Sequence, residues 1–577
     1  VLLQLPPPHI LREGMPGVRR FFHRYTTDEA VTNRSARVVF LGQQGAGKTT
    51  LVRSMRTAAF SPAQHEKPPV VKHVSLLEVS CCSLSRPVGG ELATTLCSLW
   101  DLSGNPDYAT AMLPYMSAGS LYVIAVPVPV STNELRRSLT YWLDLVQMAA
   151  PGAVVQLVLT HCEQLVPHQL RYSPIAACPS GMAVPMAGIQ ALAANDLAEV
   201  RAAVKQVLAN QQVVAPTMAP LRVQEEITCF STVSSSSADT LRARLHEVLV
   251  SEPPLLSCMG QRIPYSTLQA ISFLQSLRDG REALYAPEGR IVPQEKEQQH
   301  RPICMGKSSV CQTEVEGRWL KVLSSMVPTV PSDAVLTLHH AVALLVDQGE
   351  LYRYGKVILF KPDTIARFLH ALVDVGYARQ LIENVSDEQQ RKLVLFSLTR
   401  LVTHGELHEE LLRELWDPFG LPLAETMEMV LSLCASGGLV LAEHTQSGRR
   451  LMVPLRMPKL YSTSADDPEW QALLKRDDAK RVALSFRDWD PELTPLLGIT
   501  SRVLAVCCST ATRCCKYDNR SAVLEVSISE SSGSDAASDG PALLWVEMRE
   551  SGELVIEACA AGLSTSQPLL TFLLQIR

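Results

Sequence analysis

Residues 42–49 read Gly-Gln-Gln-Gly-Ala-Gly-Lys-Thr, and they constrain the fold more than any other part of the chain. The five residues before them, 37–41, are mostly apolar and β-branched and predict a strand. The residues from Lys48 to about Phe60 predict a helix. A Gly-x-x-x-x-Gly-Lys-Thr pattern placed between a strand and a helix is typical of a phosphate-binding loop.

The chemistry of such a loop follows from its residue types. Its glycines let successive backbone N–H groups turn towards an anion, and the N-terminus of the helix adds its positive dipole. Lys48 is expected to reach the outer phosphates of a nucleotide, and Thr49 to bind Mg²⁺. The alternative is a glycine-rich turn with a purely structural role. The residues predicted to contact the nucleotide are Gly42, Gln43, Gln44, Gly45, Ala46, Gly47, Lys48, Thr49 and Thr50.

A second candidate element, Trp100-Asp101-Leu102-Ser103-Gly104, follows the apolar run 95–100. Asp101 at the end of a strand beside the loop could hold Mg²⁺ through water, and the N–H of Gly104 could contact a γ-phosphate. An Asp-x-x-Gly spacing alone is common in loops. Its position after an apolar strand favours the functional interpretation.

A third element, Thr160-His161-Cys162-Glu163, directly follows the apolar run 154–159. A carboxylate here could accept both N1–H and N2–H₂ of guanine, a pair of donors that adenine does not present. The alternative is an ordinary turn with a solvated Glu163 and a surface His161. Ser231, after the short apolar run 227–230, could approach the base through its backbone.

The surrounding pattern predicts a mostly parallel sheet with helices on both faces. The runs 121–127 and 154–160 are apolar without alternation, as in strands covered on both faces. An amphipathic segment between them, 133–149, predicts the crossover helix. Further helices are predicted at 192–210 and 239–250, and Pro253-Pro254 marks a domain boundary.

The rest of the chain changes character twice. It is predicted to be largely helical to about Cys434, and a hairpin follows with strands at 439–443 and 450–454. The last third predicts an antiparallel β region that ends in a helix at 567–574. Its expected strands are 481–486, 501–508, 522–528, 543–548 and 554–559.

Composition excludes several classes of protein. A net charge of −5 and a pI near 6.3 over 577 residues argue against a nucleic-acid binder. No run of 18 apolar residues predicts a transmembrane helix, and the N-terminus does not read as a signal sequence. The 15 cysteines lack paired Cys-x-x-Cys spacing, which favours reduced thiols and a cytoplasmic location.

Together these elements resemble the Roc–COR tandem of the ROCO family of Ras-like GTPases. The form of the base motif with Thr-His and then Asp or Glu at the fourth position, seen here at residues 160–163, is typical of that family. Segments similar to recurrent COR elements follow at 263–266, 349–352, 357–362, 405–407 and 415–416. The segment from Pro6 to Tyr25 resembles the cap of a leucine-rich-repeat array.

The resemblance implies a domain order and a function. The expected order is a leucine-rich-repeat end cap or linker at 1–34 and an α/β Roc GTPase domain at 35–252, followed by an α+β COR region. COR would comprise a helical and winged-helix part at 258–457 and a β-rich part at 458–577. The implied ligands are GTP or GDP with Mg²⁺ held by Thr49 and Asp101. The implied partners are a second copy bound through COR and protein effectors, in a GTP/GDP switch.

Three departures from the family pattern bear on hydrolysis and base choice. Glu163 replaces the usual Asp, and Asn105 stands where Ras-like proteins often have a water-positioning Gln. No Thr between residues 60 and 81 could serve as the switch I ligand, and Ser75 is only a weak substitute. Slow hydrolysis is therefore expected. The alternatives are a non-catalytic nucleotide-binding scaffold and a signalling P-loop ATPase. No kinase motif is present in the sequence.

Overall fold

This computed structural model describes most residues between 30 and 561. The longer ranges outside the description are 1–14, 20–29, 57–76, 166–193, 280–308, 417–439, 457–467, 487–506, 527–541 and 562–577. By internal contacts the chain forms two units. The first comprises 1–104 and 115–366, and the second comprises 105–114 and 367–577. Within the described residues, no helix combines the length and the apolarity needed to cross a membrane.

A seven-stranded sheet forms the centre of the first unit, with the order β3-β4-β2-β5-β6-β7 and with β8 also paired to β6. All neighbours are parallel except β3 and β4, which form a long antiparallel pair. The strands are β2 (Ser35–Leu41), β3 (Leu77–Val88), β4 (Glu91–Leu102), β5 (Leu121–Pro127), β6 (Val154–Thr160), β7 (Arg222–Val223) and β8 (Thr228–Cys229).

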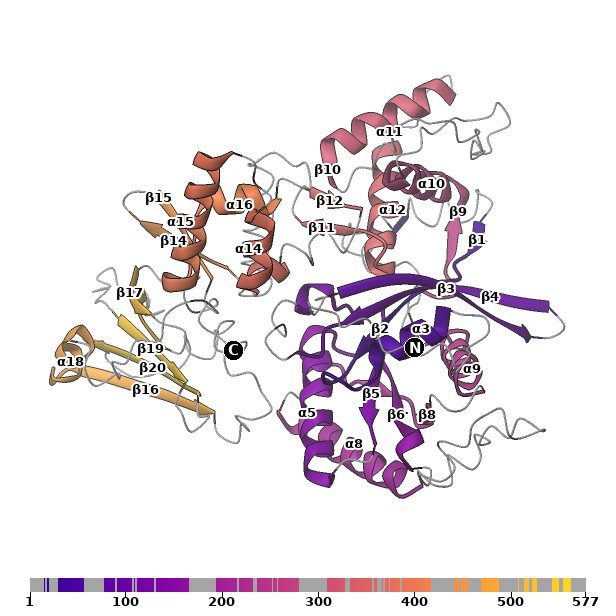
Figure 1. The fold of residues 1–577 in the computed structure, drawn as a ribbon, viewed down its shortest axis with the longest axis horizontal. Coiled ribbons are helices and arrows are strands. Elements are labelled where there is room, and N and C mark those ends of the chain that lie inside the picture. The colour runs from indigo at the N-terminus through magenta and orange to yellow at the C-terminus, as the bar shows by residue number, and fades with distance from the viewer. Residues whose placement is uncertain are drawn as a thin grey trace. The chain divides into compact units, whose positions relative to one another are not determined.

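Helices cover both faces of this sheet (Figure 1). They are α3 (Lys48–Arg56), α5 (Thr132–Ala149), α8 (Ala194–Val214) and α9 (Ser237–Leu249). The start of α5 is set by a capping box, in which Ser131 accepts from the Glu134 N–H and the Glu134 side chain accepts from the Ser131 N–H. The apolar stripe of α5 is buried, as its sequence period requires.

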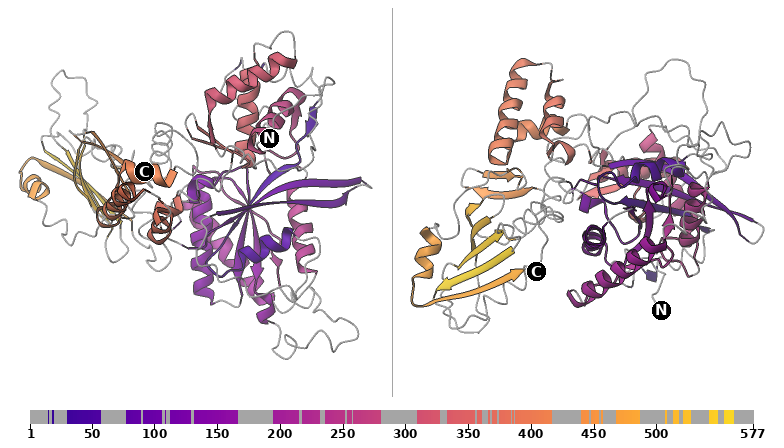
Figure 2. Two further views of the ribbon diagram at one scale, coloured as in Figure 1. Left: turned by 45° about the horizontal axis from the view of Figure 1, so that its top comes forward. Right: turned by 60° about the horizontal axis from the view of Figure 1, so that its bottom comes forward.

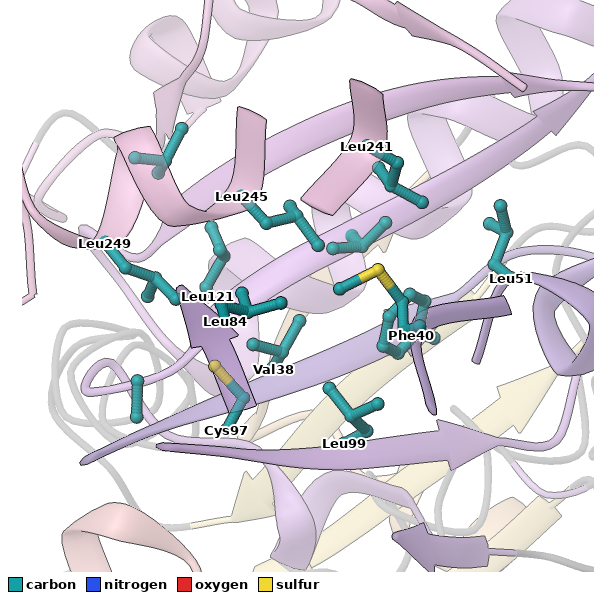
Figure 3. Packing of buried hydrophobic residues seen from close by; sticks show 14 of the residues in the cluster. Val38, Phe40, Leu51, Leu84, Cys97, Leu99, Leu121, Leu241, Leu245 and Leu249 are labelled. Atoms are coloured by element: carbon teal, nitrogen blue, oxygen red, sulfur yellow. The ribbon is translucent and has the colours of Figure 1, made fainter. Parts of the chain in front are cut away.

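The main core lies between the sheet and the helices α3 and α9. Alternate residues of β2, namely Ala36, Val38 and Phe40, point into it because successive side chains of a strand face opposite ways. Leu241, Leu245 and Leu249 of α9 pack on them one helical turn apart (Figure 3). This packing fixes β2, and with it the start of the phosphate-binding loop.

The first unit continues beyond Pro253-Pro254 with helices and two small antiparallel sheets, β1 with β9 and β10-β12-β11. A second core, centred on Phe273, Trp319 and Leu338, joins the three helices that carry these residues, α10, α11 and α12. The Trp319 indole N–H donates to the Ala334 carbonyl at 2.9 Å. The elements are β1 (Ala30–Thr32), β9 (Arg262–Pro264), α10 (Tyr265–Asp279), β10 (Ser309–Cys311), α11 (Gln312–Met326), α12 (Ala334–Gln348), β11 (Tyr352–Tyr354) and β12 (Val357–Leu359).

The buried guanidinium of Arg37 connects the large sheet to this second core. It lies on the face of β2 opposite α9, donates to Ser120 Oγ at 2.6 Å and to Tyr352 OH at 3.3 Å, and also donates to Ser117 Oγ. The Trp100 ring lies 5.0 Å from its Cζ. No described carboxylate forms an ion pair with Arg37, so hydroxyl groups and an aromatic face solvate the charge.

The second unit contains a helical part and two antiparallel sheets, β13-β15-β14 and β16-β20-β19-β18-β17 (Figure 2). The short segment 105–114 belongs to it, and Tyr108 OH lies 3.2 Å from His370 Nδ1. Its elements are α14 (Val375–Glu383), α15 (Glu388–His404), β13 (Glu406–Leu407), α16 (Glu409–Trp416), β14 (Leu441–Thr445), β15 (Gly448–Met452), α18 (Pro468–Leu474), β16 (Ala479–Phe486), β17 (Arg513–Tyr517), β18 (Ser521–Val526), β19 (Ala542–Met548) and β20 (Leu554–Ala561).

The predicted fold class is confirmed for both regions, but several strands were missed, among them β3 and β17. The strand β3 escaped sequence analysis because its polar and cysteine-rich residues show no clear period, and it makes the sheet mixed. The strand β17 was also missed. The predicted leucine-rich-repeat cap lies almost wholly outside the described residues, as do the helix at 567–574 and, apart from Cys507, the strand at 501–508.

Substitution of Gly349 should test the packing around Arg37. Gly349 ends α12 with φ +73°, and an added Cβ would overlap the Arg37 side chain. We expect Gly349→Ala to lower the free energy of unfolding by about 1–3 kcal/mol, because strain and overpacking add. The matched control is Gly317→Ala inside α11, where no atom lies within 4 Å of the new Cβ. Equal stability of the Gly349 variant and the wild type in urea denaturation would contradict this account.

Candidate nucleotide-binding site

The Gly-rich loop connects β2 to α3 at the carboxyl edge of the parallel strands. Gly42, Gly45 and Gly47 have positive φ, and the Ala46 N–H donates to the Gln43 carbonyl at 3.1 Å. These conformations turn the backbone into the concave form that binds anions. Residues 43–45 are exposed, whereas Ala46 is buried and Thr50 is partly buried at the start of the helix.

Lys48 lies folded back over the loop. Its Nζ donates to the Gly42 carbonyl at 2.7 Å and to the Gln43 carbonyl at 3.0 Å. Burial lowers the pKa of Lys48 to about 8, against the opposing effect of the Asp101 carboxylate. A phosphate in the loop would favour the charged form, because an opposite charge offsets the cost of burying an ammonium group.

Thr49 and Asp101, the two predicted Mg²⁺ ligands, meet at the edge of the sheet. Because β2 and β4 are parallel neighbours, with Phe40 opposite Asp101, both strands deliver their last residues to the same place. Thr49 Oγ1 donates to Asp101 Oδ2 at 2.6 Å. Burial raises the pKa of Asp101, while the Thr49 hydroxyl and Lys48 oppose that change.

Gly104 packs directly against the loop. A Cβ at this position would lie 2.5 Å from the Gln43 carbonyl carbon, the Gln44 nitrogen and Lys48 Nζ. Only a glycine allows this approach, which explains why the Asp-x-x-Gly element needs its last residue. Asn105, which follows directly, falls in the second unit.

The Thr160-His161 pair holds the loop from its other side. Thr160 Oγ1 donates to the Ala46 carbonyl at 2.8 Å, and His161 Nε2 lies 2.8 Å from the Gly45 carbonyl oxygen. His161 has φ +58°, a conformation that costs a residue other than glycine about 1–3 kcal/mol and that clusters at functional sites. The sequence gave no sign that this pair contacts the loop.

Glu163 lies beside His161, with Oε1 3.5 Å from Nδ1. The hydrogen bond to Glu163 raises the pKa of His161, and the Gly45 carbonyl acts in the same direction while burial opposes it. A protonated His161 can donate to Gly45 and Glu163 at once, whereas the neutral ring carries a single N–H.

Ser231 is buried directly after β8, next to the 160–163 segment. The Cys162 N–H donates to the Phe230 carbonyl at 3.3 Å, and Ser237 Oγ donates to the Ser231 carbonyl at 2.6 Å. Ser237 was not identified from the sequence. Ser237 is the first residue of α9, two residues before the predicted start of that helix. The signal that could have found it is its place in a serine run just before a helix, because such hydroxyls often satisfy nearby backbone groups.

The residues present fit a nucleotide with a divalent cation. The loop offers backbone N–H donors and a lysine, and Thr49 and Asp101 place a hydroxyl and a carboxylate side by side, oxygen ligands of the type that Mg²⁺ prefers. Elsewhere among the described residues no cluster of three or more His, Cys, Asp or Glu side chains could hold a metal. Residues 57–76, which include Ser75, lie outside the description.

Comparisons with known proteins show what part of this chain resembles. Residues 37–163 match the family model described as Roc, "Ras of Complex, Roc, domain of DAPkinase". A solved structure of Methanosarcina barkeri Roco2 RocCORdC bound to GDP is similar over 74% of this chain and 99% of that chain, with 12% identity and a TM-score of 0.42. No curated protein matches.

The pH dependence of stability should reveal the His161 contacts. Because the folded-state pKa is raised above the ordinary 6.5, the stabilisation is complete below about pH 6.5 and is lost as pH rises through the folded pKa. We expect the thermal unfolding midpoint of the wild type to fall, relative to His161→Asn, between about pH 6 and pH 8. Asn suits this control because it does not titrate and tolerates positive φ. Parallel curves for the two proteins would contradict the assignment.

Proposed function

Because residues 37–163 form a domain of the Roc family of Ras-like proteins, we propose that this chain binds GTP and GDP and works as a slow GTP/GDP switch. The observation that carries the proposal is the convergence of two distant segments on one loop. Asp101 and Gly104 approach the loop from one side, and Thr160 and His161 from the other. A structural turn would have no need of such an arrangement.

Each group has a task in binding the nucleotide. The loop N–H groups and Lys48 bind the phosphates, and Gly104 leaves room for its own N–H to approach the outermost phosphate. Thr49 and Asp101 would hold Mg²⁺, which when bound neutralises phosphate charge. The Glu163 carboxylate accepts from guanine, and the 160–163 motif connects that base contact to the loop through Gly45 and Ala46.

The first test is nucleotide competition on the purified chain. Lys48→Ala should lose GTP binding while the fold survives, and Glu163→Ala should keep phosphate binding but lose its preference for GTP over ATP, since a paired polar group discriminates strongly. Lys205→Ala and Glu225→Ala remove exposed charges elsewhere in the domain and are the matched controls. Unchanged GTP affinity in the Lys48 variant would overturn the site. A wild type that prefers ATP would instead identify a signalling ATPase.

Slow hydrolysis is the second expectation. Asn105 has a shorter side chain than Gln, so it places water poorly, and single-turnover hydrolysis should run at or below about 10⁻⁴ to 10⁻³ s⁻¹. Asn105→Gln should raise that rate without changing affinity. Turnover of several per minute in the wild type would show that another residue supplies catalysis. Complete absence of hydrolysis in both proteins would support the nucleotide-binding scaffold instead.

We also propose that residues 258–577 are a COR region that senses the nucleotide. In support, the chain leaves the first unit at Gly104, the residue packed on the loop, and residues 105–114 belong to the second unit. A change in the Asp101–Gly104 segment on hydrolysis would therefore act on a segment packed in another body. Order and disorder of such loops is a common basis of switching.

The last proposal is dimerisation through residues 460–577, and it rests on a strand edge instead of on exposed sheet faces. Leu544 and Val546 on one face of the large antiparallel sheet are buried, as are Val523 and Trp545 on the other, so uncovered faces do not support it. What remains is β16, an edge strand whose backbone could pair with a second copy.

Sedimentation of the full chain and of a version ending near Met457 tests this interface. We expect a dimer only in the full chain, because the truncated version lacks β16. In the full chain, Pro substitution at Ala483, an exposed position of β16, should weaken the dimer, since it removes a backbone donor. Monomers in both versions would exclude the dimer, and dimers in both would place the interface elsewhere.

A further inference from the structure

Two cysteines lie directly opposite each other on the antiparallel strands β3 and β4. Cys82 pairs with Cys97 in the register of the two strands, so their side chains lie on the same face of the pair. Opposed residues in an antiparallel pair have Cα atoms about 4.5–5.5 Å apart, which falls within the range that a disulfide spans. Both thiols are reduced in this structure.

The two thiols differ in ways that suit a redox pair. Cys82 lies on the edge strand and is partly exposed, whereas Cys97 is 2% exposed within the core cluster (Figure 3). The neighbouring Cys97 thiol lowers the pKa of Cys82, burial opposes this change, and the charge of Arg242 also lowers the pKa. The neighbouring Cys82 and burial both raise the pKa of Cys97. An accessible thiol of lowered pKa beside a second thiol is the arrangement found in oxidation-sensitive sites.

We propose that Cys82 and Cys97 form a reversible oxidation site that hydrogen peroxide converts to a β3–β4 disulfide. The Cys82 thiolate attacks a peroxide oxygen, so that an S–O bond forms, the O–O bond breaks and hydroxide leaves as water after taking up a proton. The Cys97 thiol then attacks the Cys82 sulfur. An S–S bond forms, the S–O bond breaks, and the second water carries away the Cys97 proton. Two thiols lose two electrons and one peroxide becomes two waters.

The Cys82–Cys97 pair lies on the strand pair that leads to the candidate nucleotide-binding site. β4 ends at Asp101 and Leu102, and Asp101 pairs with Glu78 of β3. A covalent link at Cys82 and Cys97 would fix the register of the two strands four residues before Asp101. The oxidised form therefore has an edge strand that cannot slide or peel away from β4.

Three other cysteines provide internal comparisons. Cys162 and Cys229 are also neighbours, but both are fully buried, so peroxide should not reach them. Cys81 is exposed, but it lies opposite Ser98, and side chains of adjacent residues in a strand face opposite ways. The proposal thus predicts one specific pairing among several cysteines that are close in sequence or space.

Peptide mapping without reduction tests the site on the folded full chain. After limited peroxide treatment we expect one cross-linked peptide that joins Cys82 to Cys97 and disappears with dithiothreitol. It should form equally in Cys81→Ser and in Cys162→Ser. In Cys97→Ser the link cannot form, and Cys82 should instead be captured as a sulfenic acid by dimedone.

Three results would overturn the proposal. The first is the absence of the 82–97 peptide at peroxide levels that fully oxidise Cys81. The second is a dominant link between Cys81 and Cys82. The third is an 82–97 link that forms as readily in urea as in the folded protein, because that would be random pairing of nearby cysteines. None of these outcomes depends on whether the chain binds GTP.

Discussion

The contact between Gly104 and the phosphate-binding loop is the constraint on which the site depends. It exists because β2 and β4 are parallel neighbours that end at the same edge of the sheet, one leading into the loop and the other into Asp101. The approach is so close that a single methyl group at Gly104 would meet the loop backbone and Lys48 together. Movement of one segment must therefore displace the other, and this coupling is required of a loop whose position depends on its ligand.

Arg37 connects the same sheet to the residues that follow it in the first unit, through Tyr352. Burying a guanidinium without a carboxylate is costly, and here three hydroxyl groups and the Trp100 ring share the charge. Tyr352 comes from the region after the Roc domain, and Trp100 directly precedes Asp101. The strand that carries Asp101 is thus packed, one residue away, against a cluster that includes the following region. Displacement of that strand would therefore disturb the packing around Arg37.

The sequence predicted those features that follow from local chemistry. The Gly-rich loop, α5 with its apolar stripe, and the runs that became β5 and β6 were all recognisable, because burial on both faces and glycine spacing leave clear patterns. β3 could not be found, since an edge strand with Cys81, Cys82 and several serines shows neither the helical nor the alternating strand pattern of apolar residues. The contacts of Thr160 and His161 with the loop could not be predicted either, because the two side chains contact carbonyl groups that lie 114 and 116 residues earlier in the chain.

The hydrogen bonds within the site indicate what binding must change. Lys48 donates to two loop carbonyls, and Thr49 donates to Asp101, so these polar groups already have partners. A nucleotide therefore exchanges hydrogen bonds instead of adding them, and exchange of neutral partners contributes little net free energy. The larger gain is electrostatic, because burial disfavours the charged forms of both Lys48 and Asp101. A phosphate beside Lys48 and a cation beside Asp101 would each stabilise the charge that the protein alone holds at a cost. The two ligands should consequently bind with positive coupling.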